Sequence, residues 1–494
     1  MIGLVAAVVC LPLTSAIAAA FTSRARTLGT VATASGLGTL AAAAAMAVRL
    51  GGGAHFSAAG GFVYLDPLSG FFMLTIAIVV ALASMGSAAY MRADEHDKVL
   101  RPLQVRLYFV FFALFASMML ASFATGNLGL LWVLIEASTL ASCVLVGLEA
   151  DALSLEAAWK YIIISSFGVT IALAGTVFLY YAASKLGGTA SEHLTWPFLH
   201  ARAHGLSSQA MRLSFLLIVV GYGTKVGLAP MHSWLPDAHA QAPSPASAML
   251  SGALLNTGMY AIVRFRSLAD IALGSSYASH ILLVFGFISV VVGTLFIVLR
   301  GNFKRVFAYS SVEHMGIIAI ALGFGGTLGL YGALLQTLTH AVGKTVLFLT
   351  SGDVVLKFRT RLVSEVHGLL GVLPVSGIAL VLGSIAVAGS PPFGVFLSEL
   401  TIVRAGFASA TPGLAIALLV LLAIVFIALT GATAGMTFGP TPEPAGSAGP
   451  YPDEPSRLQA AVPLVAGLAG LLLLGLWIPA GLNTLIMHSI RVIS

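Results

Sequence analysis

The sequence predicts an all-α polytopic membrane protein with about fourteen transmembrane helices, two of them broken. Hydrophobic residues make up 58% of the 494 positions and charged residues only 9%, and the mean hydropathy is +1.00. Soluble domains of this size do not have that composition. No polar stretch exceeds about thirty residues, which is less than a domain requires, so we expect no separate soluble domain.

Apolar runs long enough to cross a bilayer, roughly 17 to 25 residues each, recur along the whole chain. Because no basic residues precede the first run, we predict that it is a transmembrane helix and not a cleaved signal peptide. The two longest polar stretches, 183–211 and 438–456, are predicted to be surface loops. The approximate cores of the runs are 2–21, 28–48, 65–90, 107–124, 128–148, 157–182, 212–229, 245–265, 278–299, 306–325, 329–352, 373–403, 413–437 and 459–485.

Prolines interrupt two of these runs. The seventh run continues into a segment with Pro230 and Pro236, and the twelfth contains the adjacent Pro391 and Pro392. Each proline removes a backbone donor and clashes with the preceding helical turn. Two breaks about five spans apart, each close to an intramembrane charge, are typical of transporters built from inverted repeats.

We therefore predict two inverted five-helix repeats. In proteins of this kind the transport path lies near the middle of the bilayer, beside the broken helices. The expected organisation is N-terminal helices 1 to 3 in 1–106, a first repeat in 107–265, a second repeat in 266–437, and a loop with the last helix in 438–494.

Two charged residues lie deep in the predicted first repeat. Placing an ionised group in hydrocarbon costs several kcal/mol or more, so such residues usually mark an ion or proton path. Glu136 lies about 12 Å along its helix, at 1.5 Å per residue, which is too deep for its short side chain to reach the interface. Lys225 comes just before the seventh-helix break. We predict a proton path through both; the alternative is a structural hydrogen bond to a neighbouring helix.

The predicted second repeat carries its own set. His340 and Lys344 are four residues apart and share one helical face. Two adjacent cations are costly unless one of them is neutral, which suits a proton relay. Glu399 follows the Pro391–Pro392 break and completes the set, with a merely interfacial position as the alternative.

Three further residues are weaker candidates for the proton path. For His314 the alternative is a hydrogen-bonded helix histidine, for Lys160 it is a lysine that reaches the interface from a helix start, and for His232 it is a helix cap.

Redox and metal chemistry find no support in the sequence. Cys10 and Cys143 are far apart, and an iron–sulfur cluster needs about four cysteines. The chain has no phosphate-binding glycine loop, no HExxH and no cysteine–histidine cluster. We therefore expect no cofactor and no metal. The net charge of +6 is modest and indicates no nucleic-acid partner.

Basic residues in the predicted loops indicate the orientation of the chain. With the N-terminus outside, thirteen lysines and arginines, Lys304 among them, fall in inner loops, and eight, including Arg264 and Arg266, fall on the outer side. An excess of basic residues marks the cytoplasmic side. We expect a multi-pass protein of the cell (inner) membrane with both termini extracytoplasmic.

Five segments, 222–239, 304–316, 339–344, 155–161 and 390–399, resemble signatures of one superfamily. The first three resemble the seventh-, tenth- and eleventh-helix signatures of antiporter-like subunits of the respiratory complex I and membrane-bound hydrogenase superfamily. The last two are most similar to component F of hydrogenase-4-type complexes. The resemblance implies fourteen helices, two inverted five-helix repeats, and breaks in helices seven and twelve.

The resemblance also implies roles for individual residues. Glu136 and Lys225 match the acid–lysine pair of a first half-channel, and Lys344 and Glu399 match the connecting lysine and the exit residue of a second. Asn256 stands where some relatives carry a lysine or histidine, so water is expected to complete that link.

The expected function is that of a proton-translocating subunit that couples the redox energy of partner subunits to proton movement through two half-channels. Its partners would be other membrane and peripheral subunits, the lipid bilayer and protons; redox chemistry is not expected in this chain itself. Two alternatives stay open: a subunit of a multi-subunit sodium/proton antiporter, or the proton-driven membrane partner of an inorganic-carbon uptake system.

Overall fold

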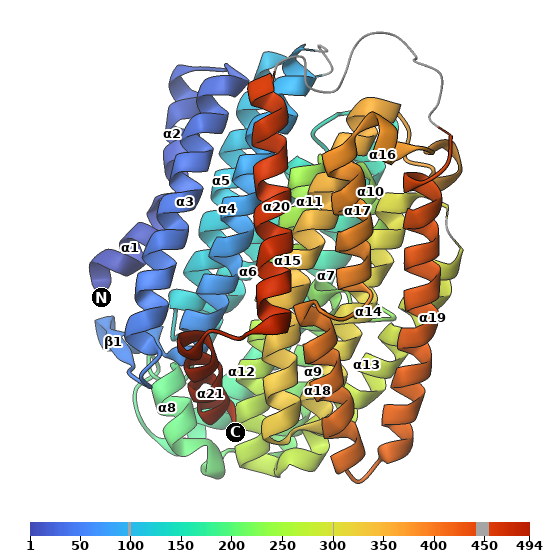
Figure 1. Ribbon diagram of the computed structural model, residues 1–494. Coiled ribbons are helices and arrows are strands. Elements are labelled where there is room, and N and C mark those ends of the chain that lie inside the picture. The colour runs from blue at the N-terminus through green and yellow to red at the C-terminus, as the bar shows by residue number, and fades with distance from the viewer. Residues whose placement is uncertain (97–99, 300, 441–453) are drawn as a thin grey trace.

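The computed structural model describes residues 1–96, 100–299, 301–440 and 454–494, and within them it is a bundle of long helices (Figure 1). A short hairpin of two strands is the only sheet in this part of the chain. In chain order the elements are α1 (Ile2–Cys10), α2 (Leu13–Phe21), α3 (Ala25–Leu50), β1 (Phe56–Ala58), β2 (Val63–Leu65), α4 (Pro67–His96), α5 (Pro102–Ala124), α6 (Leu128–Val146), α7 (Ala152–Ala183), α8 (Trp196–Arg202), α9 (Ser208–Val226), α10 (Trp234–Gln241), α11 (Ser244–Met249), α12 (Leu255–Leu273), α13 (Ser275–Val298), α14 (Phe303–Phe324), α15 (Gly326–Phe358), α16 (Leu369–Val372), α17 (Pro374–Val387), α18 (Gly394–Ala408), α19 (Pro412–Thr437), α20 (Glu454–Leu476) and α21 (Ala480–Ile493).

The prediction of an all-α polytopic membrane fold is confirmed, but the number of fourteen spans is not. Among the described residues, nine helices are long and apolar enough to cross a membrane, and up to eleven if each of two bent pairs counts as one span. Every predicted core coincides with a helix or an interrupted pair of helices. The count falls short of fourteen partly because the twelfth span is broken into two helices that are each too short to cross a membrane: α17 has 14 residues and α18 has 15.

Both predicted breaks are present. The seventh span ends with α9 at Val226, and the helix resumes as α10 at Trp234; the twelfth ends with α17 at Val387 and resumes as α18 at Gly394. Gly227 ends α9 in the left-handed region with φ +81°, and a Cβ there would collide with Leu235. Glycine is therefore required at this turn.

The ends of the chain differ from the prediction. The predicted core 459–485 is not one helix, because α20 stops at Leu476 and α21 turns away by 73° after Pro479. The core 2–21 bends by 47° between α1 and α2, beside Pro12. Most of the predicted loop 438–456 lies outside the described residues.

The two halves of the bundle share an order of neighbours. In the first half α6 packs against α7, which packs against α9; in the second half α14 packs against α15, which packs against α17 and α18. Five spans in each unit would start the second copy on the opposite side of the membrane. This order supports the inverted repeats, and the boundaries at 107–265 and 266–437 stay a prediction.

Three basic residues assigned to loops are in fact buried in helices. Arg264 and Arg266 lie in α12, and Lys304 lies in the first turn of α14. Arg264 forms a two-pronged ion pair with Asp66, with N–O distances of 2.7 and 2.8 Å, and Arg266 pairs with Asp270 at 3.0 Å. Charges buried inside the protein do not report on membrane orientation, so the placement of both termini stays a prediction.

Candidate functional site

Lys225 is the centre of the first half. Its side chain is fully buried, and Nζ donates to Thr139 Oγ1 at 2.7 Å and to the Tyr161 hydroxyl at 2.9 Å. The ammonium also lies 5.0 Å from the centre of the Tyr161 ring. Gly221 positions this lysine, because a Cβ there would collide with Ala172 and push α9 away from α7. The lysine is thus held by two hydroxyls from two neighbouring helices.

Glu136 approaches Lys225 through a hydroxyl. It lies on α6, half-buried, and accepts from Ser166 Oγ at 2.6 Å and from Thr139 Oγ1 at 3.4 Å. Thr139 therefore contacts both the acid and the lysine. Among the residues that the structure describes, no ion pair joins Glu136 directly to Lys225.

Tyr161 and the seventh-helix break are tied together. The Tyr161 hydroxyl shares a hydrogen bond of 2.6 Å with Ser142, and its ring centre lies 4.7 Å from that of the buried Trp234. Trp234 begins α10, beyond the break, and donates its indole N–H to the Thr224 carbonyl at 2.8 Å. The break is therefore anchored beside Lys225.

The start of α7, which carries Tyr161, is fixed by a cap outside the membrane span. Asp151 accepts from the Ser154 amide at 2.7 Å, and its own amide donates to the Ser154 hydroxyl at 3.1 Å. Hydrogen bonding by Ser154, first by its side chain and then by its amide, lowers the pKa of the Asp151 carboxyl group. The cap stays charged and the helix start stays fixed at neutral pH.

Lys344 is the centre of the second half. It is fully buried on α15 and donates to the Phe307 carbonyl of α14 at 3.2 Å. Glu313, also buried on α14, lies close enough to interact with Lys344 electrostatically. Glu313 Oε2 has no hydrogen-bond partner and lies 3.7 Å from His314 Nε2.

Two imidazoles and an amide extend this centre towards α18. The rings of His314 and His340 lie 5.2 Å apart, and neither nitrogen of His340 has a hydrogen-bond partner. Gln336 Nε2 donates to His314 Nδ1 at 2.7 Å, and Ser398 donates to Gln336 Oε1. The polar line therefore crosses from α14 through α15 to α18.

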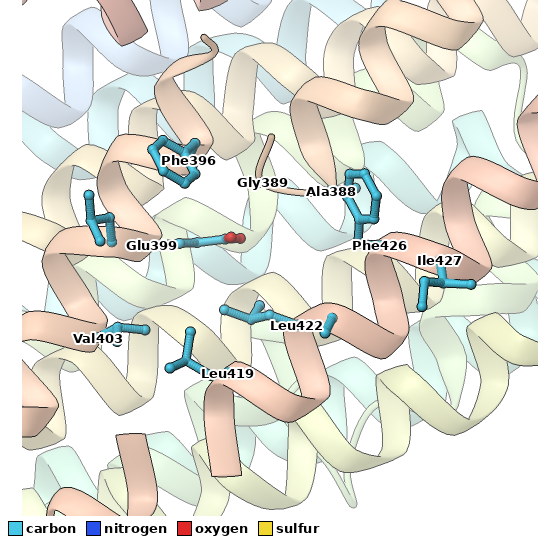
Figure 2. A pocket seen from close by; sticks show the side chains of 11 residues that line it. Ala388, Gly389, Phe396, Glu399, Val403, Leu419, Leu422, Phe426 and Ile427 are labelled. Atoms are coloured by element: carbon cyan, nitrogen blue, oxygen red, sulfur yellow. The ribbon is translucent and has the colours of Figure 1, made fainter. Parts of the chain in front are cut away.

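Glu399 ends this line at a pocket (Figure 2). Glu399 follows Ser398 on α18, and its carboxyl group points into a cavity of about 380 Å³ between the twelfth-span break and α19. Gly389 borders the carboxyl group with φ +74°, and a Cβ there would collide with Glu399 Oε2. The other lining residues are apolar: Ala388, Phe396, Leu400, Val403, Leu419, Leu422, Ala423, Phe426 and Ile427.

Lys160 and His232 lie outside both centres. The side chain of Lys160 is 46% exposed and pairs with Glu156 at 2.6 Å and Asp237 at 3.1 Å. His232 lies in the seventh-helix break, with its ring 6.1 Å from that of Tyr309. The structure thus gathers Glu136 with Lys225, and His314, His340, Lys344 and Glu399 with one another, but it leaves these two apart.

Asn256 lies on α12, between the two centres. Its side-chain amide donates to the Gly252 carbonyl at 2.8 Å, and its Oδ1 is buried without a hydrogen-bond partner. Gly258, on the same helix, packs against the Lys225 Cβ, and Gly252 packs against Ala341 of α15. An unpaired buried oxygen at this point fits the expectation that water completes the link.

Several site residues were not predicted from the sequence. Glu313 is an acid inside an apolar run and satisfies the criterion that selected Glu136, so the same argument would have found it. Thr139, Ser166 and Gln336 carry no such signal, because neutral polar side chains are common in membrane helices. Among the described residues, no group of three or more His, Cys, Asp and Glu could hold a metal ion.

Comparisons with known proteins identify the family of the chain. Residues 124–426 match the family model described as NADH:quinone oxidoreductase/Mrp antiporter, TM. The chain is 38% identical over 379 residues to the hydrogenase-4 component F homolog of Methylacidiphilum infernorum (isolate V4), covering 77% of this chain and 79% of that protein.

Two solved structures share the fold. A chain of the Mrp complex from Dietzia sp. DQ12-45-1b superposes with a TM-score of 0.82 at 22% identity, covering 100% of this chain and 97% of that one. A chain of respiratory complex I from Thermus thermophilus superposes with a TM-score of 0.80 at 22% identity, covering 99% and 100%. The predicted family is confirmed: this chain belongs to the antiporter-like membrane subunits of the NADH:quinone oxidoreductase/Mrp antiporter family, and it is similar to component F of hydrogenase-4.

Proposed function

We propose that this chain is the proton-translocating subunit of a multi-subunit membrane complex, in which partner subunits supply redox energy. Family membership and the similarity to a hydrogenase-4 component F homolog support this role. Chains of the same fold occur in the Mrp complex and in respiratory complex I, which supports a place among other membrane and peripheral subunits. Redox chemistry is assigned to those partners.

One observation carries the proposal: Lys225 is buried against two neutral hydroxyls, with Glu136 one hydroxyl away. Opposite unit charges about 4 Å apart interact by about 4 kcal/mol at an effective dielectric near 20. A movement of the Glu136 side chain towards or away from Lys225 therefore changes whether the lysine holds or releases its proton. A partner that moves α6 relative to α9 can drive such a switch.

In this mechanism the second centre receives the proton and passes it outwards. Lys344 and His340 lie on one face of α15, and His314, Gln336 and Ser398 lead to Glu399 at the pocket beside α19. Imidazole accepts a proton on one nitrogen while it releases one from the other, which suits a relay.

Reporter fusions test the orientation. We propose a location in the cell (inner) membrane with both termini extracytoplasmic. Fusions in 92–106 and in 357–361 are expected to report cytoplasm, and one after Ser494 the opposite side. Contrary results at two of the three positions would reverse the orientation.

The experiment that tests transport uses the assembled complex in inverted membrane vesicles, where proton uptake and partner turnover are measured together. Lys225→Ala and Lys344→Ala are each expected to lower proton uptake by more than about tenfold, since general acid–base groups contribute about 100-fold or more. Co-purification of the partner subunits controls for assembly. Normal uptake in either variant refutes the role of that lysine, and uptake that requires Na⁺ favours the sodium/proton antiporter.

A further inference from the structure

A second pocket, polar in its lining, lies where α4, α6 and α15 end. These helix ends lie at the opposite end of the bundle from the β1–β2 hairpin (Figure 1). Its volume is about 400 Å³, and neither charge centre contributes to it. Acidic and basic side chains both line it, so water wets its walls readily. The lining residues are Tyr90, Asp94, Glu149, Val355, Leu356, Arg359, Thr360 and Arg361.

Arg361 links this pocket to a buried lysine. Its guanidinium pairs with Glu149 at 3.5 Å and donates to Gln241 Oε1, at the end of α10, at 2.5 Å. The carbonyl of the next residue, Ala242, accepts from Lys304 Nζ at 2.6 Å. Lys304 is only 2% exposed, and Gln241 and Ala242 connect it to Arg361 in the wall of the pocket.

Within the described part of the chain, Lys304 lacks the bonded carboxylate that a lysine in a structural ion pair would have. The hydrogen bond of its ammonium is to a neutral carbonyl, whereas a buried charge is normally retained with a bonded counter-charge. Glu149 and Arg361 are the charged groups of the neighbouring loops that act on it, with opposite signs. The protonation state of this lysine is therefore not fixed by a bonded carboxylate.

His239 continues the route from Lys304 towards Lys344. The Ser247 hydroxyl donates to the Ala242 carbonyl at 3.3 Å and to the His239 carbonyl at 3.0 Å, so the backbone of His239 shares a hydroxyl with the carbonyl that accepts from Lys304. The His239 ring is fully buried and stacks on Phe348 at 4.8 Å. Phe348 is one helical turn from Lys344 on α15. His239 interacts electrostatically with both Lys304 and Lys344.

We propose that Lys304 and His239 form a proton entrance from this pocket to Lys344, separate from the Glu136–Lys225 centre. The inference rests on the proposed proton-translocating function and adds a second intake to it. A proton from pocket water binds the neutral Lys304 amine and passes to the His239 imidazole. It then passes to the neutral Lys344 amine, and each donor returns to its neutral form. The second half then has an intake as well as an exit at Glu399.

The test compares two replacements of Lys304 in the assembled complex, by proton uptake into inverted vesicles. Lys304→Arg keeps the charge and the donor to the Ala242 carbonyl but cannot release a proton. Lys304→His has a shorter side chain than lysine but carries a group that binds and releases a proton near neutral pH. If Lys304 is the proton entrance, uptake should be at least about tenfold faster in Lys304→His than in Lys304→Arg. This factor is smaller than the roughly 100-fold that a general acid–base group contributes. Equal rates, or a faster Lys304→Arg, overturn it, because a structural lysine is better replaced by arginine.

His239→Gln is the second test, and it does not require that Lys304 variants assemble into the complex. It keeps a polar side chain without a titrating group, and uptake is expected to fall at least about tenfold. Wild-type uptake in this variant overturns the proposal even where Lys304 variants fail to assemble. The matched control is Lys185, an exposed lysine on the Tyr181 ring, whose arginine and histidine variants are expected to transport equally.

Lys344→Ala separates the two proposals. Loss of uptake in Lys344→Ala together with normal uptake in Lys304→Arg and His239→Gln removes the entrance and leaves the translocating function intact. Normal uptake in Lys344→Ala removes the function of the second half itself.

Discussion

The two charge centres differ in what joins the acid to the base. In the first half Thr139 alone stands between Glu136 and Lys225, and hydroxyls complete the contacts. In the second half two imidazoles, an amide and the Ser398 hydroxyl extend over three helices and end at a cavity beside Glu399. The first centre is compact and the second is extended.

This difference assigns different tasks to the two halves. A hydroxyl donates and accepts hydrogen bonds but does not hold an extra proton near neutral pH, whereas an imidazole does. The hydroxyl-bridged centre can therefore change its electrostatics when one side chain moves, while the imidazole-rich centre can carry protons over distance. In the proposed function, we therefore expect switching in the first half and conduction in the second.

Glu136→Gln tests the switching role and is expected to have the largest effect. The change removes the negative charge, so uptake is expected to fall up to about 1,000-fold, nearly as far as in Lys225→Ala, because the attraction of about 4 kcal/mol that Glu136 offers when it approaches Lys225 to about 4 Å is lost. Glu136→Asp keeps the charge at shorter reach and should retain part of the activity. If vesicles with Glu136→Gln pump normally and the complex is intact, the carboxylate is structural and the comparison fails.

Gly389→Ala tests the conducting half. The added methyl group would collide with the Glu399 carboxyl group at a left-handed backbone position, and overpacking of this kind costs about 1–3 kcal/mol. Proton uptake is expected to fall between about fivefold and 100-fold while partner turnover continues. Gly435→Ala is the control, because nothing lies within 4 Å of the Cβ added there. Equal behaviour of the two variants would show that the position of Glu399 is unimportant.

Thr139→Val tests whether the hydroxyl transmits the effect of Glu136. Valine has nearly the same shape but loses the hydrogen bond to Lys225, and bonds to charged groups contribute about 1.5–3 kcal/mol. Uptake should fall about tenfold, and Thr139→Ser should restore most of it. A valine variant that still depends on Glu136 as the wild type does would rule out the bridge.

Lys160→Met is expected to have the smallest effect. The lysine is half-exposed and pairs with the exposed Glu156 and the partly buried Asp237, and exposed ion pairs contribute about 0.2–1 kcal/mol. Uptake should change by less than about fivefold. A loss as deep as that of Lys225→Ala would return Lys160 to the proton path and extend the first centre to the surface.

Features that depend on one stretch of chain could be predicted from the sequence. The prolines at 230 and 391 identify both breaks, and charges inside apolar runs identify Glu136, Lys225, Lys344 and Glu399. These signals are local, because a proline or an unpaired charge disturbs its own helix wherever the partner helices lie.

Features that depend on contacts between distant stretches could not be predicted. The bond from Lys225 to Thr139 joins residues 86 apart, and nothing near either one signals the other. Arg264 and Arg266 sit at the end of an apolar run, where a loop position and a buried position give the same pattern. The same holds for α21, because hydropathy does not record the angle at which a helix leaves its predecessor.

The ion pair between Asp66 and Arg264 also has a consequence for how the chain is made. The two residues are 198 positions apart, so the ribosome, at about 5–20 residues per second, adds Arg264 about 10 to 40 s after Asp66. During that interval the carboxylate at the start of α4 lacks its buried partner, and an unpaired charge there costs several kcal/mol. The first helices therefore cannot settle into their final positions early in synthesis. We expect them to reach their final positions only after α12 has been synthesised and Arg264 can pair with Asp66.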